Sequence, residues 1–221
     1  MTIVIKTIYS IPEDVIRYIF DFLGRGNDAN NLLESSNKLF MFCTRDYHFW
    51  KLTKNQSKWY YVSEDYRKKI VGFMRDPAKQ LAINLMYCSK VRDVAVLKGV
   101  HTIDLSGCKN ISNLAAISGV NTLSLYDCTH LTDITGLTNV KHINLQYCRF
   151  IDDISSLRTA ESVNLSYCYA VTDVSVLANV KNVNLSFCWN VRDISALSKY
   201  GAYAGGCALL NRDNMLDSHL Y

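Results

Sequence analysis

The sequence has no long apolar run, and its first residues do not have the pattern of a secretory leader. No stretch approaches the roughly 18 consecutive apolar residues of a membrane-spanning helix. The first ten residues, "MTIVIKTIYS", lack the basic start, the full apolar core and the small-residue cleavage site of a secretory signal. We therefore expect an intracellular protein, cytoplasmic or nuclear, whose eight cysteines are thiols and not disulfides.

Runs of like charge are also missing. The net charge is +4, and residues 1–80 carry 13 basic and 9 acidic side chains, so residues 81–221 are balanced at 11 of each. Neither part contains a basic arm or a basic stripe, which argues against a nucleic-acid-binding role.

Motifs for catalysis and metal binding are absent as well. None of the five histidines stands in a recognisable motif with serine or cysteine, and no glycine-rich phosphate loop occurs. The cysteines are too far apart in the sequence for a zinc knuckle, and none has a histidine at ligand spacing. We expect a chain that is not an enzyme and that has no cofactor and no metal site.

What the sequence does contain is an internal repeat of 20 residues. It is marked by Cys88, Cys108, Cys128, Cys148, Cys168 and Cys188, with Cys207 one residue early. A period of this length is typical of stacked repeats.

Apolar residues recur in columns around each cysteine. Leucine precedes it by three residues (Leu85, Leu105, Leu125, Leu145, Leu165, Leu185), and Ile, Leu or Val precedes it by five (Ile83, Ile103, Leu123, Ile143, Val163, Val183). This alternation predicts a short strand with one buried face. The apolar residues after each cysteine come three apart, which suits a turn and a short 3₁₀ segment. One such unit cannot bury its apolar side alone, so we expect a solenoid.

Two further columns have structural interpretations. Seven equivalent cysteines make no sense as nucleophiles, and a small, largely apolar side chain with a weak S–H donor suits the turn after a strand. An acidic or amide column (Asp93, Asn113, Asp133, Asp153, Asp173, Asp193) precedes each outer turn. We expect it to accept backbone N–H bonds, an interpretation favoured over a calcium ladder because the glycine-rich calcium repeat is absent.

The segment "TLSLYDCTHLTDITGL" (Thr122–Leu137) resembles the cysteine-containing type of leucine-rich repeat. The resemblance implies an α/β solenoid over residues 80–200, with about six 20-residue repeats, curved, with a parallel sheet on its inner surface. Residues 201–221 would form a C-terminal cap and tail, in which Tyr203 and Gly205 replace the expected Val and Leu.

The front of the chain has a different pattern. Residues 8–53 predict three short helices, the last containing Phe49, Trp50 and Leu52, and residues 54–79 predict a helical linker. In that linker, Ser63–Pro77 would be one amphipathic helix with Tyr66, Ile70, Phe73 and Met74 inward, joining the two parts as a rigid rod.

Residues 8–53 resemble an F-box, through Ile11-Pro12, Ile19-Phe20…Leu23 and Phe49-Trp50-Lys51-Leu52. F-box proteins dock on a Skp-family adaptor of a cullin–RING ubiquitin ligase, and their repeats hold the substrate. The resemblance implies an adaptor-binding set of Ile11, Pro12, Val15, Ile19, Phe20, Leu23, Leu32 and Leu33. Trp50 fits a core or an interface role equally well.

An alternative interpretation is a leucine-rich-repeat interaction module or inhibitor whose N-terminal helices only cap the solenoid. If the F-box is real, the chain could serve its own cell or be an invading agent's means of redirecting a host ligase.

Aromatic side chains gather in the last three repeats, on the predicted inner surface. We expect a substrate-binding set there, together with Tyr126 of the repeat before: His142, Asn144, Tyr147, Arg149, Asn164, Tyr167, Tyr169, Asn184, Phe187 and Trp189. Tyr, Trp and Arg commonly anchor interfaces, although a stacked tyrosine ladder also stabilises neighbouring repeats. The asparagine column suggests capture of a peptide-like backbone.

Overall fold

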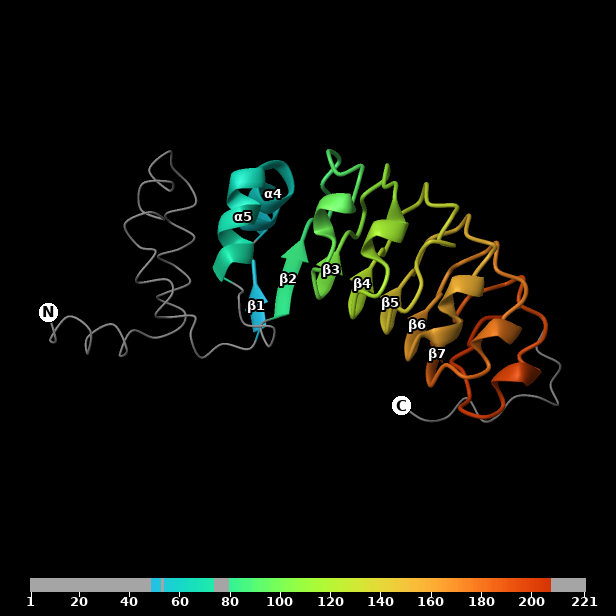
Figure 1. Cartoon of the computed structure of the whole chain (residues 1–221). Helices are drawn as coiled ribbons and strands as arrows, with labels where there is room; N and C mark the ends of the chain where they lie inside the picture. Colours follow the sequence, from blue (N-terminus) through green and yellow to red (C-terminus); the bar gives the residue numbers. More distant parts are fainter. Residues whose placement is uncertain (1–48, 53, 74–79, 208–221) are drawn as a thin grey trace, which may run out of the picture. The chain divides into compact units, whose positions relative to one another are not determined.

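The computed structural model describes residues 49–52, 54–73 and 80–207 (Figure 1). The chain divides into two compact units, Met1–Gln80 and Leu81–Tyr221. The predicted adaptor-binding residues, Ile11, Pro12, Val15, Ile19, Phe20, Leu23, Leu32 and Leu33, lie outside the described residues.

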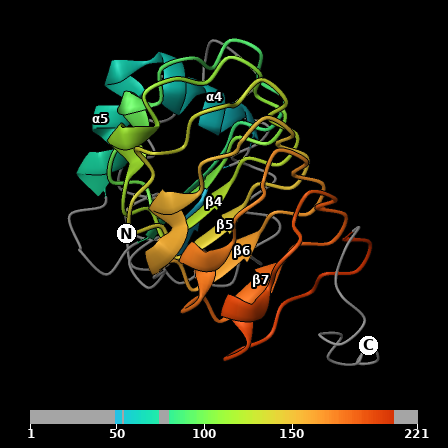
Figure 2. The same ribbon diagram turned by 90° about the vertical axis from the view of Figure 1, so that its right-hand side faces the viewer.

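The second unit is a repeat solenoid built on a parallel sheet. Its strands are β2 (Gln80–Asn84), β3 (Thr102–Asp104), β4 (Thr122–Ser124), β5 (His142–Asn144), β6 (Ser162–Asn164) and β7 (Asn182–Asn184). Each strand pairs with the next in parallel at an offset of 20 residues, so Ile103 faces Leu123 and Leu123 faces Ile143. The strands line one side of the row of repeats in chain order (Figure 1), and β4 to β7 can be followed side by side in the second view as well (Figure 2). The expected leucine-rich-repeat solenoid is thereby confirmed at the level of the fold.

The solenoid core consists of the predicted apolar columns and one more. The leucine three residues before each cysteine is at most 1% exposed in every repeat, because the strands alternate buried and solvent-facing positions. The additional buried column closes each repeat before the next strand: Val100, Val120, Val140, Ala160 and Val180. It recurs every 20 residues and was therefore visible in the sequence.

The outer side of the repeats contains the expected 3₁₀ segments: Ala95–Leu97, Leu114–Ile117, Ser155–Thr159, Ser175–Leu177 and Ser195–Leu197. The capping prediction is confirmed, because Asp133, Asp153, Asp173 and their equivalents accept a backbone N–H two residues on, each at 2.8 Å. Asn113 differs: its φ is 61°, and its side-chain amide donates to Asp93 Oδ1 at 3.1 Å.

The structure shows that the last unit was aligned one residue out of register in the sequence analysis. Tyr203 forms an isolated parallel bridge with Asn184 and not with Val183, its partner under a 20-residue offset. The unit is therefore one residue short, and Ala202 and Ala204 occupy the positions that were assigned to Tyr203 and Gly205. The same shift explains the early Cys207, whose thiol still donates to Leu185 O at 3.0 Å.

The described part of the first unit contains β1 (Phe49–Lys51), α4 (Lys54–Val62) and α5 (Glu64–Phe73). The prediction of a short helix at Phe49–Leu52 was wrong, since Phe49–Lys51 is a strand; adjacent aromatic residues favour extended backbone. The predicted Ser63–Pro77 helix is α5, in which Ile70 is buried and Tyr66 is half-buried as expected. The Phe73 side chain and Met74 lie outside the described part of the chain.

Helices α4 and α5 are separate because Ser63 ends one and begins the other. Ser63 Oγ accepts the Tyr66 N–H at 3.2 Å, which caps the start of α5. Arg67 donates to the carbonyls of Tyr60 and Tyr61 at 2.8 and 2.7 Å, which gives these two carbonyl groups at the end of α4 a hydrogen-bond donor.

Over the described residues, no helix is both long and apolar enough to cross a membrane.

Candidate protein-binding surface

Each strand of the solenoid ends in a turn whose central residue has a left-handed backbone. In the repeat that contains β6, the Cys168 N–H donates to Leu165 O at 3.0 Å, and Tyr167 between them has φ 63°. The equivalent residues also have positive φ: Tyr87, Gly107, Asp127, Tyr147, Phe187 and Gly206. This conformation costs a residue with a Cβ about 1–2 kcal/mol, and it is rare for bulky side chains.

Three of these left-handed residues form an aromatic stack along the row of repeats. The ring centroids of Tyr147 and Tyr167 are 4.4 Å apart at 14°, and those of Tyr167 and Phe187 are 4.6 Å apart at 15°. Tyr126 meets Tyr147 edge-on at 5.5 Å. The stack ends over Gly206, where a Cβ would lie 2.6 Å from Phe187 Cδ1.

A second, shorter stack lies beside the first, two residues further along each repeat. Tyr169 and Trp189 stack at 5.3 Å and 28°, and the Arg149 guanidinium lies 5.5 Å from the Tyr169 ring centroid. The two stacks meet where Tyr167 contacts Tyr169 edge-on at 6.5 Å. Together these seven residues (Tyr126, Tyr147, Arg149, Tyr167, Tyr169, Phe187 and Trp189) form what we call the aromatic surface.

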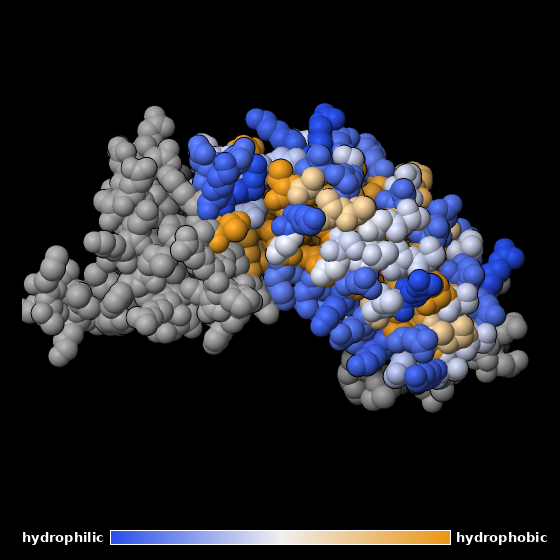
Figure 3. All heavy atoms as spheres, viewed as in Figure 1, coloured by the Kyte–Doolittle hydropathy of each residue, from blue (hydrophilic) through white to orange (hydrophobic). Residues whose placement is uncertain are grey.

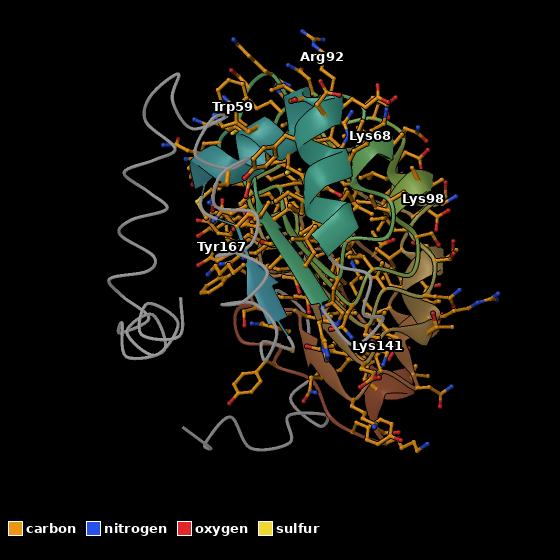
Figure 4. The ribbon with its side chains drawn as sticks, turned by 60° about the vertical axis from the view of Figure 1, so that its left-hand side comes forward. Trp59, Lys68, Arg92, Lys98, Lys141 and Tyr167 are labelled. Atoms are coloured by element: carbon orange, nitrogen blue, oxygen red, sulfur yellow. The ribbon has the colours of Figure 1, made fainter. Side chains whose placement is uncertain are left out.

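The aromatic surface is accessible over much of its extent. Trp189 is 54% exposed and Phe187 is 39% exposed, while the tyrosines are half-buried by their neighbours. Tyr167 and Lys98 project from opposite sides of the solenoid (Figure 4). Each ring is held by its neighbours before any partner arrives, so binding would cost little side-chain entropy.

The structure gives the predicted asparagine column a role within the fold. Asn144 Oδ1 accepts the Gln146 N–H at 3.1 Å, and Asn184 Oδ1 accepts the Ser186 N–H at 3.0 Å. Asn164 Oδ1 accepts both the N–H and the hydroxyl of Ser166, at 3.0 and 2.6 Å. Each oxygen therefore holds the turn after its strand, and it is the amide nitrogen that remains for a partner.

The cysteines are structural, as the sequence predicted. From Cys108 to Cys207, the thiol donates to the carbonyl of the leucine that lies before the turn of the preceding repeat, as in Cys148 to Leu125 at 3.1 Å and Cys188 to Leu165 at 2.9 Å. Burial raises the pKa of both thiols to about 12, so they are protonated donors at neutral pH. Cysteine thus ties each turn to the one before it.

The structure therefore brings the predicted aromatic residues and Arg149 together, with Asn144, Asn164 and Asn184 on the neighbouring strands. His142 lies exposed at the start of β5, one strand position before the buried Ile143. Whether any of them binds a substrate stays a prediction. The sequence analysis missed the left-handed backbone, for which Gly107 and Gly206 in the same column were the available signal.

On the face of the molecule seen in Figure 3, apolar and polar residues are intermingled over the described part of the chain.

A shallow pocket lies on the outer side of the last repeats, between Asp173, Arg192 and Asp193. Among the residues that the structure describes, no group of three or more His, Cys, Asp or Glu side chains is arranged to hold a metal ion.

Comparisons with known proteins add one structural likeness. No protein-family model and no curated protein matches this chain. A crystal structure of internalin C2 from Listeria monocytogenes strain 4b F2365 is similar to it, with 23% sequence identity and a TM-score of 0.31. The match covers 57% of this chain and 66%, just under two thirds, of the internalin chain. The fold of this chain rests on its own strand register and on its 20-residue spacing of leucines: it is a leucine-rich-repeat solenoid.

Proposed function

We propose that this protein is the substrate-recognition subunit of a Skp–cullin–F-box ubiquitin ligase. Residues 8–53 would dock the Skp-family adaptor, and the solenoid would bind a target protein through the aromatic surface. The chain itself would be non-catalytic and intracellular. Its contribution to the reaction is proximity, because holding the target near the ubiquitin-charged enzyme raises its effective concentration.

The binding half of the proposal rests on one observation, the strained aromatic stack. Tyr147, Tyr167 and Phe187 adopt a left-handed backbone that glycine adopts without cost at Gly107 and Gly206. Backbone strain of this kind concentrates at functional sites, where the side chain is needed for another purpose. Ordered Tyr, Trp and Arg side chains are the groups that carry most of the energy of protein interfaces.

The ligase half rests on the sequence of residues 8–53. Ile11-Pro12, Ile19-Phe20 and Leu23 match the opening of the F-box pattern, and they stand ahead of leucine-rich repeats. By matching position, Val15, Leu32 and Leu33 would complete the adaptor face.

A second candidate is a leucine-rich-repeat interaction module whose front end only caps the solenoid. One observation favours it: Phe49–Lys51, which would lie in the closing helix of an F-box, is strand β1. Such a module would bind the same target but would have no adaptor.

Co-purification with a Skp-family adaptor distinguishes the two candidates. We expect a one-to-one complex with the full chain, lost on the double change Pro12→Ala, Ile19→Asp. The matched control is Val71→Asp, which places the same charge on α5 at a position that is 55% exposed; this variant should retain the complex.

Circular dichroism melts of all three proteins check that the solenoid stays folded. A well-folded wild-type chain that forms no complex would leave the interaction module as the function.

A further inference from the structure

The face of β5, β6 and β7 presents hydrogen-bond donors. The Oδ1 atoms of Asn144, Asn164 and Asn184 already accept backbone N–H groups of their own turns. The same bonds set the orientation of each amide, because only its oxygen can accept an N–H. What each asparagine offers a partner is therefore its NH₂ group, and three such groups follow one another at the spacing of parallel strands, about 4.8 Å.

Arg149 adds a cation to the same side of the same repeats. It is exposed and lies over the Tyr169 ring, which holds it beside the first aromatic stack. We call Asn144, Asn164, Asn184 and Arg149 the donor strip. Aromatic ring edges, which stacked rings turn outward, are also the electropositive part of the ring.

In the columns that form the donor strip and the aromatic stacks, carboxylates occur only in earlier repeats. Asp104 stands in the asparagine column of β3, and Asp127 stands in the left-handed turn column of the next repeat, both before the donor strip begins. In the three repeats of the strip, the solvent-facing strand positions and the two aromatic columns contain no Asp or Glu. The nearest acids in sequence are Glu161, whose carboxylate has Lys141 Nζ at 3.9 Å, and Asp152, whose Oδ1 accepts the Asp153 N–H at 2.8 Å.

We propose that the donor strip and the aromatic surface together bind an acidic segment of the target protein. This inference rests on the proposed binding function of the solenoid and names the chemistry of what it recognises. Carboxylates of the segment would accept from the asparagine NH₂ groups and from Arg149, and its apolar side chains would pack on the rings. Asp104 and Asp127 would repel such a segment and limit it to the last three repeats.

The chain itself offers a conservative variant for the test. Asp104 Oδ1 accepts the N–H and the hydroxyl of Ser106 at 3.0 and 2.6 Å, the same two bonds that Asn164 forms with Ser166. Asn164→Asp therefore keeps the turn and changes only the outward group from a donor to an acceptor.

Arg149 also has a matched control. Lys109 stands in the same column two repeats earlier and is likewise exposed. Arg149→Glu and Lys109→Glu change the net charge equally, but only the first lies in the donor strip.

The experiment is a selection of random octapeptides, displayed on phage, against the immobilised full chain. We expect Asp and Glu to be enriched at least about threefold over the starting library on the wild-type protein, a modest preference for complementary charge. The double variant Asn164→Asp, Arg149→Glu should lose this enrichment, whereas Lys109→Glu should retain it. Arg149→Gln, a single neutral change at an exposed position, serves as the second variant if the double variant melts early.

Three outcomes would overturn the proposal. Wild-type selection without acidic enrichment, including selection of proline-rich or basic peptides, assigns the surface to another class of segment. Enrichment that survives the donor-strip variants places acid binding elsewhere, and enrichment that Lys109→Glu also abolishes makes it a general charge effect. None of these outcomes depends on an adaptor, so failure here is distinct from failure of the ligase proposal.

Discussion

Tyr147, Tyr167 and Phe187 combine an unfavourable backbone with favourable ring contacts. The left-handed conformation costs each of them about 1–2 kcal/mol relative to glycine, and each stacked aromatic pair returns about 0.5–1.5 kcal/mol. Tyr167 belongs to two stacked pairs, with centroids 4.4 and 4.6 Å apart. The two effects are of similar size, so the stack contributes shape and order to the surface more than net stability.

This balance predicts an unusual order of stability at Tyr167. Both Tyr167→Gly and Tyr167→Ala remove the ring, but only glycine relieves the backbone at φ 63°. We expect the glycine variant to be more stable than the alanine variant by about 1 kcal/mol, measured as the free energy of unfolding in urea.

The control for that comparison is Asn182, an exposed residue in strand β7. There the order should reverse, because glycine in a strand is about 0.5–1 kcal/mol less stable than alanine. An alanine variant of Tyr167 as stable as the glycine variant would show that the turn carries no strain.

At the scale of elements, five outer turns each have one aspartate that accepts a backbone N–H, and for four of these aspartates the pKa is lowered. Hydrogen bonds to Thr135 hold the pKa of Asp133 below its usual value, the hydroxyl contributing more than the backbone N–H. The backbone N–H groups of Ser155, Ser175 and Ser195 are the main cause of the same lowering at Asp153, Asp173 and Asp193. All four groups favour the ionised form in the folded state.

A carboxyl group whose pKa is lower in the folded state than in the unfolded state stabilises the fold while it is ionised. The contribution is present above the unfolded pKa of Asp, about 3.9, and is lost as the pH falls through the lower folded value. We expect the melting temperature to be insensitive to these groups between pH 7 and 5 and to fall below about pH 4.

The variant that tests this changes Asp133, Asp153, Asp173 and Asp193 together to asparagine. An amide oxygen can still accept the N–H but does not titrate, so the acid-induced fall should be shallower than in the wild type. An identical acid profile in the fourfold variant would contradict the role assigned to the turns.

At the scale of the whole solenoid, the short last unit protects the edge of the sheet. Leu185 and Phe187 donate their N–H groups to Tyr203 O and Gly205 O at 2.6 and 2.8 Å, and Tyr203 donates to Val183 O at 2.9 Å. The missing Cβ at Gly206 allows the Phe187 ring to lie over this unit. An unpaired edge strand would otherwise be exposed to other chains.

Two truncations test that protection. A chain ending at Cys207 keeps the backbone bonds and the Cys207 thiol bond, whereas a chain ending at Tyr200 loses all of them. We expect the shorter chain to lose at least about 2 kcal/mol of unfolding free energy, since a hydrogen bond contributes about 0.5–1.5 kcal/mol. It should also self-associate in size-exclusion chromatography. Equal stability and a monomeric shorter chain would show that residues 201–207 are not a cap.

The 20-residue spacing was enough to predict the period, the strands of the solenoid, its buried columns and the roles of cysteine and aspartate. Each of these depends on contacts between one repeat and the next, and the 20-residue spacing places identical side chains in identical surroundings. The same reasoning located the aromatic residues on one side of the last three repeats.

The atoms that those residues present to a partner could be identified from the folded structure but not from the spacing. The left-handed backbone of Tyr167, the use of Asn164 Oδ1 inside its own turn and the one-residue shift at Tyr203 all depend on particular hydrogen bonds. Strand β1 at Phe49–Lys51 likewise depends on backbone conformation that a helical pattern of side chains does not specify. Periodicity specifies which side chains are buried, whereas the atoms left for a partner are those that the fold's own hydrogen bonds have not used.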